Sequence, residues 1–269
     1  MTCNIFLPGS GGGLPNLMGL KAAPEDGSRF EAIHYPGWKR YVEPQFRPEL
    51  LVAELAAEIE ARMPSGPIRI VGVSMGGHFG YLTALYLQAK GREIAGVCAI
   101  DSVMITTAAP TPGWKGRAIA EALEILRRGR FGEMLRFARS KFWRTLLRAV
   151  GGALPKLLGK AAAIGWLSHA LEIDPILKRE LDIRMMAREL APWLARIDDK
   201  PVPLTVPAAF LRTRSNADND PPWRRRCPNL VVYEINGTHD TLFEPENIGS
   251  LRDAFVKATR EWSYSTSSA

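Results

Sequence analysis

The stretch "RIVGVSMGGHFGYL", residues 69–82, joins a short apolar run directly to a glycine-serine turn. Gly72 and Gly76 flank Ser74 in a G-x-S-x-G pattern, and the residues from there to Lys90 have the composition of an amphipathic helix. A strand that turns this sharply into a helix forces the serine into a sparsely populated backbone conformation. The pattern favours Ser74 as an exposed nucleophile at a helix N-terminus, with a purely structural turn as the alternative.

Apolar runs alternate with helical patterns on both sides of this turn. Residues 68–73 and 94–101 are near-continuous apolar runs, typical of strands buried on both faces of a parallel sheet, and residues 75–90 between them predict a helix. This strand-helix-strand unit predicts an α/β fold with a mostly parallel sheet and helices on both faces. The remaining predicted elements are strands at 3–8, 29–36, 204–213 and 229–235 and helices at 48–63 and 245–262.

The alternation stops between Val103 and Lys200, where the chain is rich in Leu, Ala and Arg. We interpret residues 103–200 as a helical lid insertion, and residues 1–102 and 201–269 as the core that carries the sheet. An insertion at the C-terminal edge of such a sheet lies above the place where these folds bind ligands, which makes it a candidate lid.

The positive charge of the chain is concentrated in one segment. The formal net charge is +7, and residues 103–160 contain twelve Lys or Arg against three Glu. Such a segment suits nucleic acid, an anionic membrane or an acidic protein partner, or it forms a solvated helix face. No nucleic-acid-binding motif accompanies the charge, so we do not expect nucleic acid as a partner.

Composition excludes several other classes. No apolar stretch approaches eighteen residues and the N-terminus lacks a basic n-region, so we expect a soluble, cytoplasmic protein without a membrane partner. The three cysteines, Cys3, Cys98 and Cys227, are widely separated, which fits a reducing compartment. Four scattered histidines offer no H-x-x-x-H pair, so we expect no metal site.

A serine nucleophile needs a histidine within hydrogen-bond reach. His239 follows the last predicted strand in "INGTHDTLF", just before the C-terminal helix, where a Ser–Asp–His hydrolase carries its base. His78 lies four residues after Ser74 on the following helix, where we expect its side chain to point away from the turn and pack. His239 is therefore the predicted general base.

Two positions could supply the acid that orients the base. Asp101 closes the strand after the turn, in "CAIDS", whereas Asp218 and Asp220 lie in "RSNADNDPP", beyond the strand that follows the insertion. Both positions fall at the same edge of a parallel sheet, so geometry leaves the choice open. Aspartates in a loop rich in Asn, Asp and Pro have ample roles in turns, and we therefore favour Asp101, with Asp218 as the alternative acid.

Negative charge on a tetrahedral intermediate needs two backbone amides. One should be the amide of Met75, which follows the nucleophile. The other should come from "LPGSGGG" after the first strand, with Ser10 or Gly11 as the donor. A phosphate-binding role for this loop is weak because no Lys-Ser/Thr pair follows it.

The run "GPIRIVGVSMGGHFGYLTALYLQAKGREIAGVCAIDS", residues 66–102, resembles the thioesterase domains of polyketide and nonribosomal peptide synthetases. The resemblance extends to "FLPGSGGG", to "GTHD" and to the helical lid. It implies an α/β-hydrolase fold with Ser74 as nucleophile, Asp101 as acid and His239 as base. Stand-alone editing (type II) thioesterases are similar but typically place the acid where Asp218 stands, so Asp101 favours product release over proofreading.

The resemblance also implies the chemistry and the partner. An acyl or peptidyl chain arrives as a thioester on the phosphopantetheine arm of a carrier protein, moves to Ser74, and leaves by hydrolysis or macrocyclisation, with no bound cofactor. Carrier proteins in these natural product pathways are usually acidic, so the basic lid segment 115–160 is a candidate docking surface. A general esterase or acyltransferase of the same fold and a catalytically silent binding module are the alternatives. Candidate acyl-channel residues, each equally suited to packing the lid, are Trp114, Leu126, Trp143, Leu146 and Trp166.

Overall fold

A computed structural model of the chain describes residues 2–10, 12–15, 17, 20, 27–43, 45–104, 131–150, 157 and 174–265. The chain forms two compact units, one of residues 1–35, 47–105 and 193–269 and another of residues 36–46 and 106–192. The sheet belongs to the first unit. These bounds differ from the predicted insertion at 103–200, because residues 36–46 group with the second unit and residues 193–200 with the first. The role of 103–200 as a lid stays a prediction.

The first unit is built on a six-stranded sheet in the order β2-β1-β3-β4-β5-β6, and all five pairings in it are parallel. Strands β3 and β4 are central and every one of their residues is buried, as their apolar sequences predict. The predicted α/β fold is therefore confirmed. The strands are β1 (Cys3–Leu7), β2 (Arg29–Ala32), β3 (Ile68–Val73), β4 (Ile94–Ile100), β5 (Ala208–Thr213) and β6 (Leu230–Ile235).

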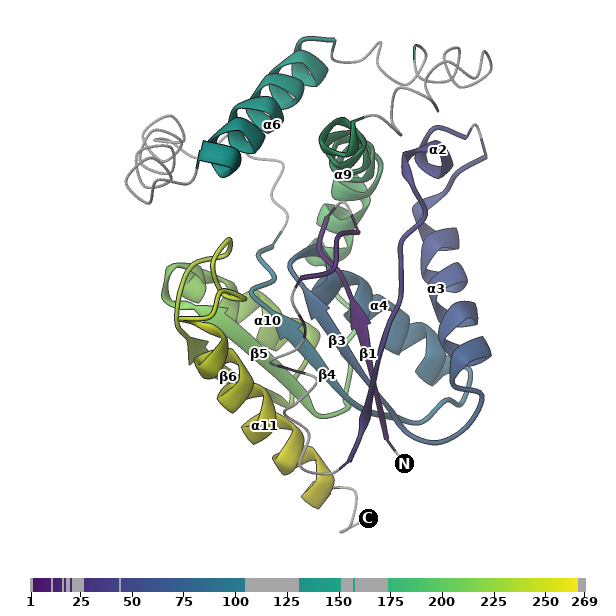
Figure 1. Cartoon of the computed structure of the whole chain (residues 1–269). Helices are drawn as coiled ribbons and strands as arrows, with labels where there is room; N and C mark the ends of the chain where they lie inside the picture. The colour runs from purple at the N-terminus through teal and green to yellow at the C-terminus, as the bar shows by residue number, and fades with distance from the viewer. Residues whose placement is uncertain are drawn as a thin grey trace. The chain divides into compact units, whose positions relative to one another are not determined.

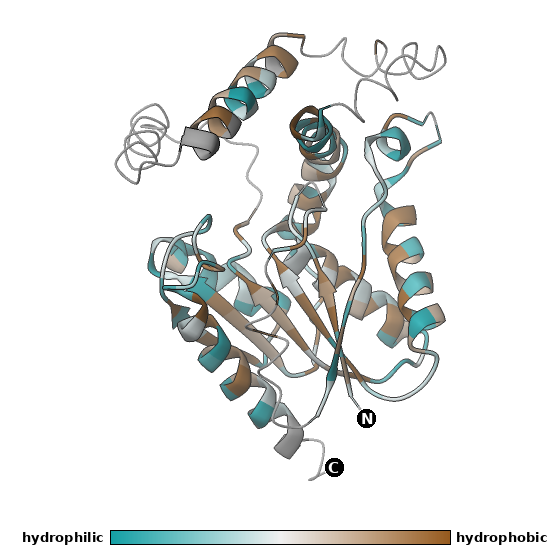
Figure 2. Ribbon diagram, viewed as in Figure 1, coloured by the Kyte–Doolittle hydropathy of each residue, from teal (hydrophilic) through white to brown (hydrophobic). Residues whose placement is uncertain are grey.

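Helices cover both faces of this sheet (Figure 1). Helix α4 (Met75–Ala89) packs on β3 and β4 with α3 (Pro48–Arg62) beside it, and α11 (Ile248–Ser265) packs on the opposite face. Bands of hydrophobic and hydrophilic residues alternate along α11 in Figure 2. Its Trp262 packs against β4, where a Cβ atom at Gly96 would come within 2.4 Å of the indole ring. Gly96 thus lets the helix approach the strand closely.

The segment 214–226 differs from the prediction. We expected turns in "RSNADNDPP", but a 3₁₀ helix η2 (Arg214–Asn219) leads directly into helix α10 (Asp220–Arg226). The two prolines after Asp220 occupy the first turn of α10, where their missing N–H groups cost no hydrogen bond. Strand β5 also begins at Ala208 rather than 204, directly after Pro207.

The second unit is helical in its described part, as the composition of residues 103–200 predicts. It contains α2 (Trp38–Tyr41), α6 (Phe131–Val150) and α9 (Pro175–Asp199) up to Pro192. Arg139 and Trp143 of α6 both bind the Asp174 carboxylate, at 2.8 and 2.7 Å, and Asp174 also caps α9. The Trp143 indole is thus held by a hydrogen bond within this unit, while Leu146 is exposed. Trp114, Leu126 and Trp166 lie outside the described residues.

Among the described helices, none is long and apolar enough to cross a bilayer. This finding agrees with the absence of a long apolar run in the sequence.

Candidate active site

Ser74 occupies the strained turn that the sequence predicts. Its backbone has φ 54° and ψ −121°, and it is the residue between the end of β3 and the first residue of α4. The turn is anchored by two backbone hydrogen bonds, from the Ser74 N–H to Ile100 O at 2.8 Å and from the Gly77 N–H to Ser74 O at 3.1 Å. The Ser74 hydroxyl has no hydrogen bond to another described residue. It is therefore available to a substrate or a base.

The glycines around Ser74 are there because the backbone passes too close for a side chain. A Cβ atom at Gly72 would lie 2.1 Å from Gly76 O, and one at Gly76 would lie 2.2 Å from Leu7 O. A Cβ atom at Gly77 would meet Ser102 Oγ at 2.0 Å. Strand β3, helix α4 and the end of β1 therefore pack backbone to backbone at this one point.

Asp101 and His239 form a hydrogen-bonded pair although 138 residues separate them in the sequence. The Nδ1 atom of His239 lies 2.8 Å from Asp101 Oδ2. The other oxygen, Oδ1, accepts hydrogen bonds from the Thr213 N–H at 2.8 Å and the Thr213 hydroxyl at 2.9 Å. Asp101 is fully buried, whereas 42% of the His239 side chain is exposed. The carboxylate is thus fixed from behind and presents one oxygen to the imidazole.

The pair perturbs the pKa of both groups. Burial by itself raises the pKa of Asp101, but hydrogen bonds from His239, Thr213 and Asn216 outweigh it and hold that pKa below its ordinary value. The hydrogen bond to Asp101 raises the pKa of His239, burial opposes this, and the charges of Asp101 and Asp240 add to the increase. Asp101 is therefore a carboxylate at neutral pH, and His239 is a stronger base than a free histidine.

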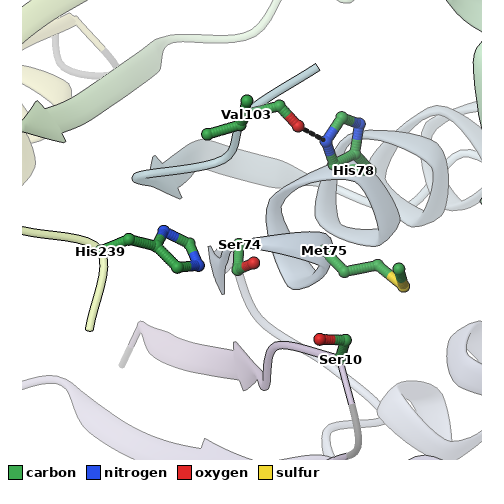
Figure 3. A pocket seen from close by; sticks show the side chains of 6 residues that line it. All are labelled: Ser10, Ser74, Met75, His78, Val103 and His239. Carbon is green, nitrogen blue, oxygen red and sulfur yellow. Dashed lines mark hydrogen bonds between the residues drawn. The ribbon is translucent and has the colours of Figure 1, made fainter. Parts of the chain in front are cut away.

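His239 and Ser74 line the same small pocket, of about 150 Å³. Figure 3 shows the His239 imidazole edge facing Ser74, with Met75 and Ser10 on the other side of the serine. The loop after β1 approaches the serine closely, since a Cβ atom at Gly9 would lie 3.4 Å from Ser74 Cβ. Met75 and Ser10, two of the predicted oxyanion donors, thus line the same pocket as Ser74. Gly11 lies outside the described residues.

Asp218, the alternative acid, is not near His239 in any described interaction. It is exposed on η2, and the neighbouring Asp220 is held by Arg212 at 3.1 Å. The last residue of β5, Thr213, and Asn216 of η2 bind Asp101 instead. Sequence reasoning missed this supporting role, for which the only signal was the position of Thr213 at the end of a strand beside β4.

His78 is buried and hydrogen-bonded, as a packing residue should be, but it also lines the pocket. Its Nε2 atom lies 2.9 Å from Val103 O and its Nδ1 atom lies 2.9 Å from Arg226 Nη1. Burial, followed by the nearby charge of Arg226, lowers the pKa of His78 to about 3. This histidine therefore stays neutral across the physiological range, and neither of its nitrogens is free to serve Ser74.

The described residues contain no group of three or more His, Cys, Asp or Glu side chains placed to hold a metal ion. Together, Ser74, the Asp101–His239 pair and the N-terminus of α4 form an arrangement suited to nucleophilic acyl transfer.

A family model of the thioesterase domain matches residues 7–160, more than half of the chain. The chain belongs to the thioesterase domain family. The matched part of this thioesterase includes Ser74 and Asp101, and it ends before β5, β6 and His239. A search of curated proteins finds no significant match.

Solved structures similar to this thioesterase share its fold at low sequence identity. The NocB thioesterase domain, in covalent complex with a fluorophosphonate nocardicin G analog, has 18% identity and a TM-score of 0.59, covering 96% of this chain and 94% of that one. The Vlm2 thioesterase domain has 16% identity and a TM-score of 0.59, covering 95% and 96%. The RedJ thioesterase from Streptomyces coelicolor has 16% identity and a TM-score of 0.58, covering 96% and 86%.

Proposed function

We propose that this thioesterase releases an acyl or peptidyl chain from the phosphopantetheine thioester of a carrier protein through an acyl-Ser74 intermediate. The observation that carries the proposal is the 2.8 Å hydrogen bond between Asp101 and His239, formed beside a strained, solvent-accessible serine in one pocket. These are the parts of a Ser–His–Asp triad, and they come from three different strand ends.

In the acylation step, the Nε2 atom of His239 accepts the proton of the Ser74 hydroxyl while Oγ attacks the thioester carbonyl carbon. Asp101 keeps the Nδ1–H of His239 hydrogen-bonded, which directs the basic Nε2 atom to the serine and stabilises the imidazolium that forms. Collapse of the tetrahedral intermediate breaks the C–S bond. The pantetheine thiolate leaves with the proton from His239, and the acyl group stays on Ser74 as an oxygen ester.

In the release step, His239 accepts a proton from the group that attacks the acyl-Ser74 ester. Water gives a free acid, and a hydroxyl or amine within the chain itself gives a ring. His239 then returns the proton to Ser74 Oγ, which restores the free enzyme. In both steps the backbone N–H of Met75, at the start of α4, and that of Ser10 or Gly11 hold the negative charge of the intermediate.

Mass spectrometry of the intact protein tests the nucleophile. Wild-type protein mixed with acyl- or peptidyl-N-acetylcysteamine thioesters should gain the mass of one acyl group, and Ser74→Ala should gain none and show no turnover above background. Ser65→Ala, at an exposed serine in the turn before β3, is the matched control and should acylate like wild type. Retained acylation of the Ser74→Ala protein contradicts the proposal.

The structural relatives support a carrier-bound substrate. One Vlm2 structure holds a dodecadepsipeptide. A four-domain nonribosomal peptide synthetase is also similar, at 19% identity, and the match covers 94% of this chain and 19% of that one. By analogy, we propose that the substrate of this thioesterase arrives on a carrier protein. A stand-alone editing thioesterase is the second candidate, and the acid position disfavours it, because Asp101 and not Asp218 holds His239.

The basic segment 115–160 is the proposed docking surface for an acidic carrier. Replacing Arg127, Arg128 and Arg136 by Glu should lower kcat/KM for a carrier-bound thioester about tenfold, because opposite charges speed the encounter, and the loss should shrink at high salt. The same variant should retain its activity on a small N-acetylcysteamine thioester. Equal losses on both substrates would rule out a docking role for these arginines.

A further inference from the structure

Arg226, the last residue of α10, is buried in the first unit although it carries a charge. Only 1% of the residue is exposed, and its guanidinium lies over the Tyr81 ring at 4.9 Å and over the Trp223 ring at 4.8 Å. Asp198 forms an ion pair with its Nη2 atom. A buried guanidinium is costly unless its charge and its N–H groups are satisfied. Asp198 satisfies only one of the nitrogen atoms, so the other nitrogens need partners too.

The second described polar partner of Arg226 is His78. Arginine only donates hydrogen bonds, so the contact of 2.9 Å from Arg226 Nη1 makes His78 Nδ1 an acceptor. The ring proton must then be on Nε2, which donates to Val103 O at 2.9 Å. Arg226 therefore selects the tautomer of His78, and the tautomer determines that His78 can hold the Val103 carbonyl.

Val103 belongs to the pocket that Ser74 and His239 line, and it follows Asp101 by two residues. The residues on either side of it are held as well. Trp223 Nε1 donates to Ser102 O at 2.7 Å, and the Met104 N–H donates to Asn219 Oδ1 at 2.7 Å. Three side chains thus hold the segment 102–104, and Arg226 contacts two of them, His78 and Trp223.

We propose that Arg226 is a positioning residue that acts through His78 to fix Val103 as the wall of the acyl pocket, and thereby sets the preference for acyl length. This inference rests on the proposed function. Val103 lines the pocket and is 41% exposed, so these hydrogen bonds, more than burial, hold it in place. When Val103 is no longer held, the pocket loses an apolar contact that a long acyl chain makes and an acetyl group does not reach.

The first test is independent of catalysis. In protein labelled with ¹⁵N-histidine, the nuclear magnetic resonance signals of His78 should show a proton on Nε2 and none on Nδ1, with no titration between pH 5 and pH 8. In Arg226→Met, whose apolar stem still reaches the two rings, Nδ1 loses its donor and the signals should move toward a mixture of both tautomers. A proton on Nδ1 of the wild-type protein, or titration in that range, overturns the proposal.

The second test compares kcat/KM for decanoyl- and acetyl-N-acetylcysteamine thioesters. The decanoyl-to-acetyl ratio should fall about tenfold in Arg226→Met, a size typical of losing one apolar contact in a pocket. His78→Phe keeps a ring against Trp223 but cannot hold Val103, and it should lower the ratio as much. The double variant should be no worse than either single one, because Arg226 acts through His78.

A merely structural Arg226 would lower the melting temperature and the rates of both substrates together, leaving the ratio unchanged, and that result overturns the proposal. Asp198→Asn is the control for charge, since it weakens the ion pair while Arg226 still reaches His78, and it should leave the ratio near that of wild type. If Arg226→Met does not fold, His78→Phe and the wild-type spectra still decide. If the wild-type protein forms no acyl-enzyme, the proposed function is refuted. The spectra still test whether Arg226 sets the tautomer of His78.

Discussion

At the scale of single residues, backbone strain is concentrated on two residues of the candidate site. Ser74 and Asp101 are the only described non-glycine residues with positive φ, 54° and 46°. Each such conformation costs on the order of 1–3 kcal/mol and persists only where the surroundings enforce it. At Asp101 the enforcement is visible, since its N–H donates to Leu211 O at 2.7 Å while its carboxylate binds Thr213 and His239.

The choice between the two acids is testable by charge removal alone. Asp101→Asn keeps the shape of the side chain but loses the charge that stabilises the His239 imidazolium and favours the wrong tautomer, so kcat should fall by about 10³–10⁴. Asp218→Asn, at an exposed residue of η2, should stay within about twofold of wild type. Steady-state hydrolysis of a small thioester measures both. A larger loss in Asp218→Asn than in Asp101→Asn would reverse the assignment.

The raised pKa of His239 fixes the pH dependence of the reaction. His239 must be neutral to accept a proton, so activity should fall as the pH drops through its pKa, at a midpoint above the ordinary value of 6.5. In Asp101→Asn the hydrogen bond that is the largest cause of the increase is altered and the charge is gone, so the midpoint of the residual activity should move to lower pH. The pH profile of kcat/KM measures the shift, and an unchanged midpoint would exclude Asp101 as its cause.

At the scale of elements, the turn from β3 to α4 depends on a close approach that a methyl group would block. Gly76→Ala would place Cβ 2.2 Å from Leu7 O, a backbone atom that cannot move without shifting β1. We expect a loss of about 3 kcal/mol in the free energy of unfolding, together with loss of activity. Gly249→Ala is the matched control in the first turn of α11, where nothing lies within 4 Å, and it should stabilise by about 0.5–1 kcal/mol. Urea unfolding compares the two.

The same close approach explains why some features could be predicted from the sequence. Gly72, Ser74 and Gly76 interact within five residues, so their spacing carries the geometry of the turn. The choice of Asp101 over Asp218 could be favoured but not decided, because the ends of β4 and β5 meet at one edge and both acids follow them. The contact of Arg226 with His78 spans 148 residues and leaves no local pattern at all.

Secondary structure after β5 was mispredicted for a related reason. Asn, Asp and Pro in "RSNADNDPP" are typical of turns, yet η2 and α10 form there. Trp223 and Arg226 of α10 are almost fully buried, and tertiary packing of this kind overrides a weak local preference. Burial of these two side chains stabilises α10 where the local sequence alone favours turns.

At the scale of the whole molecule, three segments that are distant in the sequence meet in one candidate site. Ser74 follows β3, Asp101 follows β4, and His239 follows β6, all at the same edge of the parallel sheet. Residues 103–200, the predicted insertion, lie between Asp101 and His239 in the sequence, so their number can vary without moving the strands that precede the three site residues.

The register of β4 with β5 has a consequence for the order of events on the ribosome. Asp101 finds the donors of Thr213 only after 112 further residues have been made, and His239 only after 138. At about 5–20 residues per second, that is a delay on the order of ten seconds. Until then the apolar strand β4 lacks its neighbour β5, and the nascent chain holds Ser74 and Asp101 without His239. The last two strands to emerge therefore complete the sheet and bring first Thr213 and then His239 to the Asp101 carboxylate.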